Sequence, residues 1–273
     1  MPKKQLSENK PEYTKEAEYF DKTAASVDIR KIDISKAFNS NSREGQFILK
    51  QIPRNLKHKT ILDIGCGLGE STVFLAKRGA KVTGIDIATK ALEVGKRLAK
   101  LHKVDRLASF KVSDIEKLPY PDESVDIIIG KAILHHVNLP KALLEVHRVL
   151  KKGGFAIFSD PLDYNALVKA YDRFASKGLR SPGERRLNIK DLLISKAIFK
   201  KVEWIGTDIT ALFLFLYYFL FLKLTGKVEV NWFESIQNGY KLVTPYSFFN
   251  KIDNFLPKII QLLGWRIVIL CRK

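Results

Sequence analysis

The stretch ILDIGCGLGEST, residues 61–72, decides the fold of this chain of 273 residues. A short apolar run, residues 61–64, leads directly into Gly65, Gly67 and Gly69, and a helical pattern follows. Glycine lets a backbone turn tightly and lets a ligand approach it closely, and the first turn of a helix presents unpaired N–H groups. A strand, a glycine loop and a helix in this order predict that the loop binds a nucleotide-like ligand.

The spacing of these glycines is GxGxG, which differs from the GxGxxG of dinucleotide-binding loops. Glu70 stands where a dinucleotide fold has a small residue that lets the helix pack over a pyrophosphate. A carboxylate beside a diphosphate is unfavourable. The loop is therefore expected to hold a nucleoside ligand without a diphosphate.

Outward from the loop, short β-rich runs alternate with amphipathic helical runs. This alternation predicts a doubly wound α/β fold, Rossmann-like, with a mostly parallel seven-stranded sheet covered on both faces. Helices 71–79 and 139–154 each end in glycine, as helices often do. The expected strands are 60–64, 81–86, 107–112, 125–130, 155–160, 199–206 and 265–273, and the expected helices are 71–79, 88–102, 139–154, 163–175 and 190–198.

The chain divides into three parts by composition. Residues 1–58 are polar, with helical spacing near 14–24 and 42–52, and form an expected N-terminal helical cap. Residues 59–206 and 265–273 form the Rossmann-like core if the last two strands pair at the edge of the sheet. Residues 207–264 are then a hydrophobic helical insertion between those two strands.

Two acidic residues follow the glycine loop at strand ends. Asp86 ends the second strand about twenty residues further on, where a carboxylate can accept hydrogen bonds from both ribose hydroxyls. Asp114 comes just after the third strand, in a position to bind an adenine amino group. The two acids make an adenosine-containing ligand the expected occupant.

At this point residues 60–161 resemble the class I S-adenosylmethionine-dependent methyltransferases of the small-molecule branch. The resemblance rests on several segments in order: DIGCGLG, the acid of GIDIA, SDIEKLPYPDESVD, AILHHV and RVLKKGG. It implies that S-adenosylmethionine is the cofactor. By the same resemblance the glycine loop takes the methionine part, Asp86 the ribose and Asp114 the adenine. The cofactor-binding residues so implied are Asp63, Gly65, Cys66, Gly67, Gly69, Asp86, Ile87, Asp114, Ile115 and Lys131.

Catalytic groups are expected on loops at the carboxyl ends of the strands. His135 and His136 follow the fourth strand and are candidates to accept a proton from the nucleophile; the alternative is that they line the cofactor pocket or pack. Tyr164 follows the fifth strand and is a third catalytic candidate. Asn165 and Tyr171 are candidates for contact with substrate, although half-buried tyrosines are also ordinary packing residues.

The amino-acid composition limits which cellular compartment and which binding partners are expected. Lysine and arginine number 47 against 29 acids, a formal charge of +18, spread along the chain. That excess of positive charge is compatible with binding to an anionic membrane surface, to RNA or to an anionic small molecule, and also with a solvated surface that binds none of them. The only cysteines, Cys66 and Cys271, have neither disulfide nor metal-ligand spacing, so no metal site is expected. The N-terminal residues lack a secretory apolar region, so a cytoplasmic location is expected.

The run ITALFLFLYYFLFLKL, residues 209–224, has no polar face over residues 211–222. As a membrane span it is short, because about 15 residues at ~1.5 Å each reach some 21–24 Å against a hydrocarbon core of roughly 30 Å. Two interpretations remain: a buried lid helix, or a segment that contacts the cytosolic face of a membrane. Either one places apolar surface beside the methyl-transfer site.

The expected function is methyl transfer to a small hydrophobic or amphipathic acceptor, such as a lipid, a quinone precursor or a polyketide-like molecule. A methyltransferase acting on RNA or protein is the first alternative, and the net charge favours it. A non-catalytic cofactor-binding scaffold is the second. The segment GKAILHH, residues 130–136, replaces the (N/D)PP(Y/F) tetrapeptide of amino-methylating nucleic-acid enzymes and argues against that class.

Overall fold

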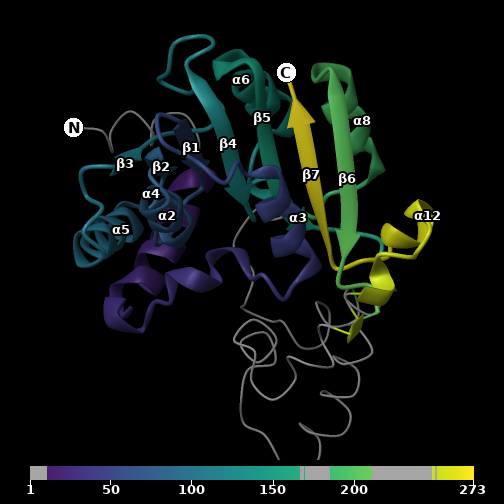
Figure 1. Cartoon of the computed structure of the whole chain (residues 1–273), viewed down its shortest axis with the longest axis horizontal. Coiled ribbons are helices and arrows are strands. Elements are labelled where there is room, and N and C mark those ends of the chain that lie inside the picture. The colour runs from purple at the N-terminus through teal and green to yellow at the C-terminus, as the bar shows by residue number, and fades with distance from the viewer. Residues whose placement is uncertain (1–10, 167–168, 170–184, 211–247, 250) are drawn as a thin grey trace, which may run out of the picture.

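The computed structural model describes residues 11–166, 169, 185–210, 248–249 and 251–273 (Figure 1). Its centre is a seven-stranded sheet in the order β3-β2-β1-β4-β5-β7-β6. Strand β7 runs antiparallel to β5 and β6, and the other neighbouring pairs are parallel. The strands are β1 (Thr60–Ile64), β2 (Lys81–Asp86), β3 (Ala108–Val112), β4 (Val125–Lys131), β5 (Leu150–Pro161), β6 (Lys201–Thr207) and β7 (Arg266–Arg272). This is the mostly parallel Rossmann-like sheet that the strand pattern predicts.

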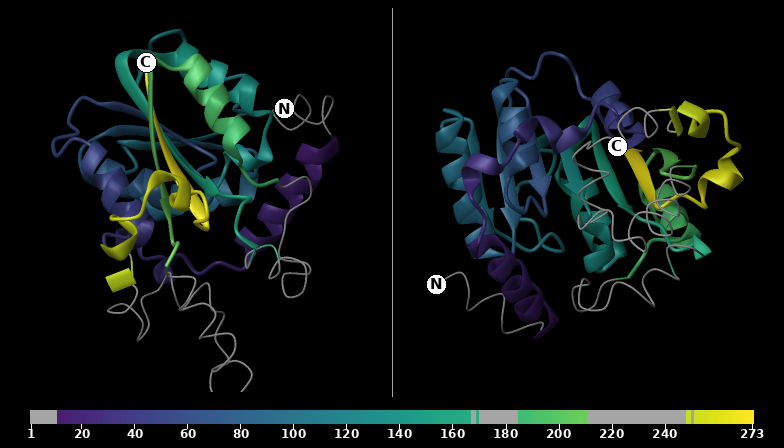
Figure 2. Two further views of the ribbon diagram at one scale, coloured as in Figure 1. Left: turned by 90° about the vertical axis from the view of Figure 1, so that its right-hand side faces the viewer. Right: turned by 90° about the horizontal axis from the view of Figure 1, so that it is seen from below.

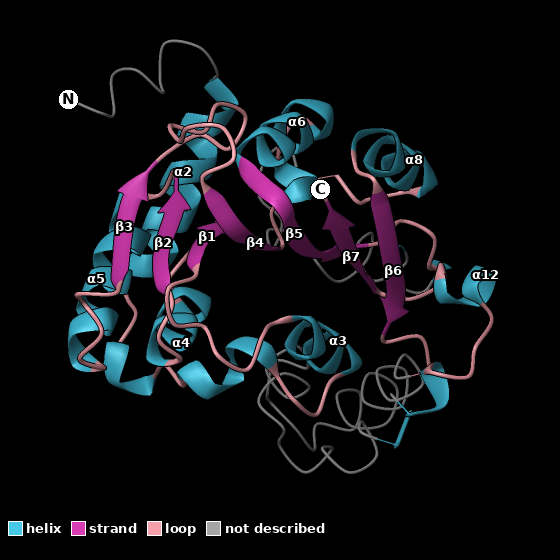
Figure 3. Ribbon diagram, turned by 45° about the horizontal axis from the view of Figure 1, so that its top comes forward, coloured by secondary structure: helices cyan, strands magenta, loops and turns pink. Residues whose placement is uncertain are grey.

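Helices cover both faces of the sheet because successive strand residues point to opposite sides (Figure 3). Ile61 and Val82 face α3, α4 and α5, whereas Leu62 and Ile128 face α6 and α8. The helices are α2 (Pro11–Ala25), α3 (Arg43–Gln51), α4 (Glu70–Lys77), α5 (Thr89–Leu101), α6 (Leu139–Val149), α8 (Ile189–Ile198) and α12 (Lys258–Gln261), with three short 3-10 helices, η1 (Ile29–Lys31), η2 (Ile34–Phe38) and η3 (Leu134–His136).

The N-terminal helix α2 packs beside α5, as two further views show (Figure 2). Its Ala24 is buried against Ala91 and Val94 of α5. Asp21 adds polar contacts there, because its carboxylate accepts hydrogen bonds from the Lys90 backbone N–H (2.7 Å) and the Thr89 hydroxyl (3.1 Å). These contacts anchor the C-terminal half of α2 to the edge of the core.

One predicted helix boundary is wrong. The helix expected over 139–154 ends at Val149, and strand β5 begins at Leu150. Leu150 pairs with Val125 of β4, and the Ser124 N–H donates to the Val149 carbonyl, so pairing with the next strand takes over from the helix. The glycine at 153, with φ 77°, lies inside the strand instead of ending the helix.

The last two strands pair as expected, and the chain between them leaves and returns at one place. Asp253 is fully buried and accepts hydrogen bonds from the backbone N–H groups of Ile209 and Thr210. An added Cβ at Gly206 would lie 1.8 Å from the Gln261 carbonyl oxygen, so only glycine allows α12 this close to β6. Residues 211–247 lie outside the described residues.

Three predictions therefore fall wholly or largely outside the part that the structure describes: the apolar run 209–224, most of the helix expected over 163–175, and Tyr171. Within the described ranges, no helix has both the length and the apolar character needed to cross a membrane.

Candidate active site

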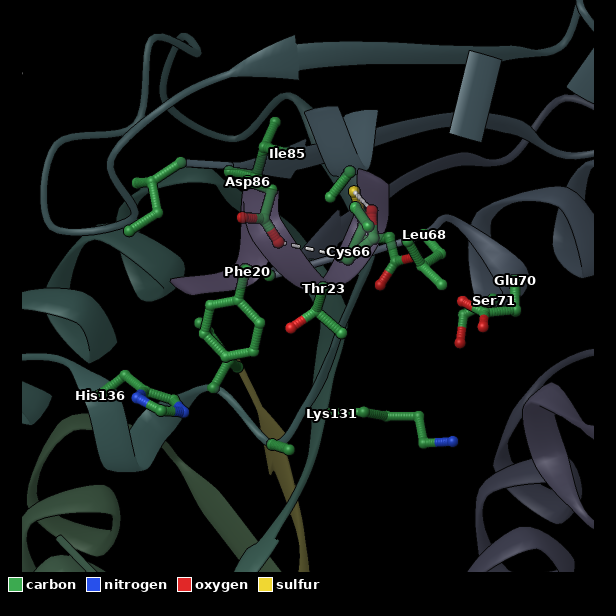
Figure 4. A pocket seen from close by; sticks show the side chains of 18 of the residues that line it. Phe20, Thr23, Cys66, Leu68, Glu70, Ser71, Ile85, Asp86, Lys131 and His136 are labelled. Carbon is green, nitrogen blue, oxygen red and sulfur yellow. Dashed lines mark hydrogen bonds between the residues drawn. The ribbon is translucent and has the colours of Figure 1, made fainter. Parts of the chain in front are cut away.

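A cavity of about 920 Å³ lies at the carboxyl ends of β1, β2 and β4, where the strand order of the sheet reverses. Ligands of open α/β sheets bind at such a switch point. The glycine loop, the ends of β2 and β4, the loop after β3, and the N-terminal elements α2 and η2 line it. Figure 4 shows Asp86 beside the glycine loop, with Phe20 of α2 between Asp86 and His136.

The three loop glycines have different structural reasons. All have positive φ: 62° at Gly65, 51° at Gly67 and 86° at Gly69, which is the N-cap of α4. An added Cβ at Gly65 would lie 2.6 Å from Ile133, and one at Gly69 equally close to Phe110. An added Cβ at Gly67 would meet no atom within 4 Å. Gly65 and Gly69 are therefore required by packing, whereas the space beside Gly67 is open.

Asp86 lies at the end of β2 and holds the glycine loop. Its Oδ2 accepts a hydrogen bond from the Gly67 N–H (2.9 Å), drawn in Figure 4, and its Oδ1 accepts one from the Ala88 N–H (2.9 Å). Burial raises the pKa of this carboxyl, and the backbone donors oppose the rise. Each carboxylate oxygen has a second lone pair, so Asp86 can accept further hydrogen bonds from a ligand.

Asp63 lies in β1, two residues before Gly65, with 2% of its surface exposed. The Thr72 hydroxyl donates to its Oδ2 (2.6 Å). Burial raises the pKa of this carboxyl to about 7, although Thr72 and the charge of Lys131 act in the opposite direction. A carboxyl with this pKa at a cavity wall gains a great deal from a cationic partner.

Asp114 and Ile115 line the cavity after β3. The Asp114 carboxylate accepts a hydrogen bond from the Glu116 N–H (2.8 Å), which fixes the loop. Glu116 in turn accepts a hydrogen bond from the Tyr13 hydroxyl of α2 (2.5 Å). The loop after β3 is thus tied to the N-terminal helix.

His135 and His136 lie in η3, just after β4, and both line the cavity. Nδ1 of His135 lies 2.7 Å from Oδ1 of Asp160, at the end of β5. Nδ1 of His136 lies 2.6 Å from Oε1 of Glu16, on α2. The two rings are close, with centroids 3.9 Å apart. Each imidazole therefore has a carboxylate behind it.

Lys131, Cys66 and Ile87 also line the cavity. The Lys131 ammonium donates to the Ala37 carbonyl (2.6 Å) and lies 5.5 Å from the centre of the Phe38 ring, so its side chain holds η2. Burial raises the pKa of the Cys66 thiol, which keeps it protonated and unreactive at neutral pH.

Tyr164 and Asn165 are not among the described residues that line the cavity. The Tyr164 hydroxyl accepts a hydrogen bond from the Ile189 N–H (2.9 Å), and the Asn165 amide donates to the Leu263 carbonyl (2.5 Å). Both therefore join the end of β5 to neighbouring segments. The catalytic role of Tyr164 and the contact of Asn165 and Tyr171 with substrate stay predictions.

Sequence reasoning missed the contribution of α2 to the cavity. The cap was expected, but nothing was expected of its individual side chains. The spacing of Glu16, Phe20 and Thr23 along one helical face is a signal in retrospect, because positions three and four apart share a face. The α2 residues that line the cavity are Tyr13, Glu16, Tyr19, Phe20, Thr23 and Ala24.

Comparisons with known proteins agree with this geometry. Residues 62–158 match the family model described as a methyltransferase domain. The match covers about a third of the chain and describes these residues as a methyltransferase domain. Methyltransferases of this family use S-adenosylmethionine as their cofactor.

Two curated relatives match the domain and its surroundings. A demethylmenaquinone methyltransferase of Symbiobacterium thermophilum is 32% identical over 151 residues, covering 54% of this chain and 58% of the relative. A ubiquinone biosynthesis O-methyltransferase of Coxiella burnetii is 34% identical over 126 residues, covering 46% of this chain and 51% of the relative. The chain therefore spans little more than half the length of these relatives.

One solved structure shows that the fold extends beyond the domain. The YcgJ protein of Bacillus subtilis has a TM-score of 0.53 and 19% identity, covering 84% of this chain and 97% of that one. At this identity the likeness concerns the fold alone.

The methyltransferase domain has groups that fit S-adenosylmethionine. The open space beside Gly67, the acceptor oxygens of Asp86 and the cavity-lining Asp114 suit an adenosine. The buried carboxyl of Asp63 suits the amino group of the methionine part. A volume of about 920 Å³ lies within the range of roughly 300–1,000 Å³ that is usual for ligand pockets.

Proposed function

We propose that this chain transfers a methyl group from S-adenosylmethionine to a small apolar or amphipathic acceptor. The observation that carries the proposal is the division of the cavity wall. Acidic and glycine residues line the part beside the glycine loop and the ends of β2 and β3. Apolar side chains from the domain and from the N-terminal segment line other parts of the same cavity, and include Phe20, Ile32, Ala37, Leu68, Ile133 and Val137.

The domain's residues bind and orient the cofactor in this proposal. Asp86 accepts the ribose hydroxyls, Asp114 with Ile115 takes the adenine, and the glycine loop with Asp63 takes the methionine part. S-adenosylmethionine supplies a methyl group already activated by its sulfonium, so that an acceptor–methyl bond forms as the sulfur–methyl bond breaks. The protein's work is then to align the acceptor and to exclude water.

The acceptor nucleophile loses a proton, and the candidate groups for it are His135 and His136. A histidine titrates near neutral pH and can accept a proton there. Both imidazoles line the cavity and have a carboxylate at Nδ1, an arrangement that orients a base and stabilises its protonated form.

Support for an apolar acceptor also comes from the named relatives, which act on demethylmenaquinone and in ubiquinone biosynthesis. Quinone precursors of this kind carry a hydroxylated ring and an isoprenoid tail. The acceptor class proposed here is a hydroxylated ring compound or lipid of similar polarity, taken up at the apolar part of the cavity.

Contact with an anionic membrane surface accompanies this proposal. Near the C-terminal end of the chain Phe255 is 88% exposed and Ile259 is 70% exposed, beside the exposed residues Lys251 and Lys258. Apolar side chains flanked by lysines bind the interface of anionic bilayers. Such contact gives a methyltransferase direct access to a lipid acceptor.

The test is methyl transfer from labelled S-adenosylmethionine to a defined panel: a short-chain demethylmenaquinone kept in its reduced hydroquinone form, a polyprenyl catechol, total RNA and a mixed protein extract. We expect label in the quinone or catechol fraction. Asp86→Asn is the matched control, because it keeps the shape of the side chain and removes the charge. Label in RNA or protein alone supports the alternative function, and cofactor binding without transfer to any fraction supports a scaffold.

A further inference from the structure

Helix α2 reaches from one side of the cavity to the other. Its C-terminal half is anchored on α5 by Ala24 and Asp21, as described above. Its N-terminal half lies against the far wall, where Tyr13 contacts Glu116 and Glu16 contacts His136. The helix therefore brings a carboxylate to a candidate catalytic histidine from a segment 120 positions away.

Glu16 is an unusual residue for a surface helix because it is 6% exposed. A buried carboxylate is stable only with a hydrogen-bonding or charged partner. Its Oε1 lies 2.6 Å from Nδ1 of His136, and each of the two side chains is 8% exposed. The Phe20 ring stands edge-on to His136, with centroids 6.0 Å apart, and helps to enclose the pair.

The contact defines the tautomer of His136. When Nδ1–H donates to a carboxylate, Nε2 becomes the proton-accepting nitrogen of the neutral ring. A proton gained at Nε2 then makes an imidazolium next to a carboxylate, a favourable pair in a buried place. This is the role that the acid plays for the histidine in hydrolytic triads.

His135 differs because the core itself holds it. Asp160, fully buried at the end of β5, contacts both Nδ1 (2.7 Å) and the backbone N–H (3.3 Å) of His135. The position of His135 is thus set by the sheet. The position of His136 depends on whether α2 is docked.

We infer that Glu16 is a positioning residue for His136, and that docking of α2 completes the base of the reaction. This inference rests on the proposed methyl transfer. The proton leaves the hydroxyl of the acceptor, is taken up by His136 Nε2 while Glu16 stays ionised, and returns to water after the product leaves. Glu16 itself gains no proton and forms no covalent bond.

The charged groups around this pair come from four segments. Glu16 and Tyr13 belong to α2, and His135 neighbours His136 in η3. Asp160 on β5 stands behind His135, and Glu116 in the loop after β3 accepts from the Asn138 N–H just beyond η3. Substitution of Glu16 removes a carboxylate that lies 2.6 Å from His136 Nδ1.

The kinetic test compares Glu16→Gln with Glu18→Gln, the same change at an exposed position of the same helix. The acceptor is whichever of the demethylmenaquinone and the polyprenyl catechol is methylated. For Glu16→Gln we expect kcat to fall about tenfold with KM little changed, and His136→Asn to lose about 100-fold. The acidic limb of the kcat profile should move to lower pH by about one pH unit, because the ring loses the anion that favours its protonated form.

A second readout needs no turnover. Nitrogen NMR of ring-labelled histidine in the cofactor-free protein reports tautomer and titration, and the five histidines make assignment simple with His136→Asn. We expect the His136 ring to be protonated at Nδ1 in the wild type and to titrate at lower pH in Glu16→Gln, with Glu18→Gln unchanged.

The outcomes separate the two claims. If the wild type transfers no methyl group, the proposed function fails, and the NMR titration still decides whether Glu16 positions His136. If His136 titrates alike in the wild type and in Glu16→Gln, the positioning role is wrong, whatever the activity. A loss of kcat with an unmoved pH profile also contradicts it, because a merely structural role predicts that pattern.

Discussion

In the proposed function, the carboxyl of Asp63 links proton binding to cofactor binding. Its pKa of about 7 in the folded, cofactor-free protein results chiefly from burial. An ionised carboxylate is the form that pairs with the amino group of S-adenosylmethionine or S-adenosylhomocysteine. Below pH 7 a proton must therefore leave before the ligand binds. The raised pKa of Asp86 acts in the same direction.

We accordingly expect the affinity for S-adenosylhomocysteine to weaken as the pH falls, by about fivefold between pH 7 and pH 6. Isothermal titration calorimetry at pH 5.5 to 8 measures it. Asp63→Asn should bind weakly at every pH and flatten the curve. A wild-type affinity that does not change over this range would show that Asp63 is already ionised without ligand.

The raised pKa of Asp63 also affects the stability of the cofactor-free protein. The pKa of Asp63 is raised from an ordinary 3.8 to about 7. The folded state therefore favours the protonated carboxyl, and its contribution to stability, full below pH 4, is lost as the pH rises through 7. Asp63→Asn keeps the acceptor for Thr72 without the charge. We expect it to raise the free energy of unfolding at pH 8, by about 2 kcal/mol, in urea titrations of the cofactor-free protein.

Residues at strand ends could be predicted from the sequence, and residues from the cap could not. Asp63, Asp86 and Asp114 belong to strands or follow them directly, so local pattern and family resemblance locate them. Glu16 reaches the site only through the packing of α2 on α5. No local pattern specifies the contact of Glu16 with His136, because the two residues are 120 positions apart.

At the scale of elements, the glycine loop must pack against its neighbours and also leave space for a ligand. Substitutions at different glycines can separate these two requirements. Gly65 is confined by Ile133, whereas nothing lies within 4 Å of a Cβ at Gly67. Gly67→Ala should cost about 1–2 kcal/mol of stability from its positive φ alone. Gly65→Ala should cost more, because Ile133 must also move.

Gly67→Ala, the less destabilising of the two changes, should weaken cofactor binding more than Gly65→Ala does. Gly67→Ala places a methyl group in the open space beside the loop, and we expect it to weaken S-adenosylhomocysteine binding at least tenfold while the protein remains folded at 25 °C. Thermal unfolding and calorimetry on both variants provide the comparison. Unchanged binding in Gly67→Ala would mean that the ligand does not approach this part of the loop.

The C-terminal element near α12 is expected to contact membranes. Phe255→Glu combined with Ile259→Glu places two acids among exposed lysines and should reduce cosedimentation with vesicles containing anionic lipid, about tenfold or more. Leu144→Glu is the control, because Leu144 is an exposed apolar residue on α6. If the double variant and Leu144→Glu cosediment equally with the vesicles, Phe255 and Ile259 do not contribute to membrane contact.

Element boundaries were predictable except where a helix runs directly into a strand. The helix expected to end at a glycine ends at Val149, because Leu150 pairs with Val125 of β4. Apolar and lysine residues there suit a helix or a strand equally well. The tertiary partner decides between them.

At the scale of the whole molecule, the central α/β unit was predictable and its additions were not. Strand alternation and the expected pairing of the last two segments predict the mostly parallel seven-stranded sheet, whereas the strand order and the antiparallel direction of β7 come from the structure. The acceptor was not predictable, because it depends on cap and insertion side chains that the domain pattern does not include. The charge of +18 concerns the entire surface and does not identify a partner.

The central claim is methyl transfer to an apolar acceptor, and the most direct measurement counts label from methyl-labelled S-adenosylmethionine. The wild-type protein and Asp86→Asn are each incubated with the demethylmenaquinone, the polyprenyl catechol, RNA and protein extract. We expect label in the organic phase with the wild type, and at least 100-fold less with Asp86→Asn. Label confined to the aqueous phase, or equal label with both proteins, would contradict it.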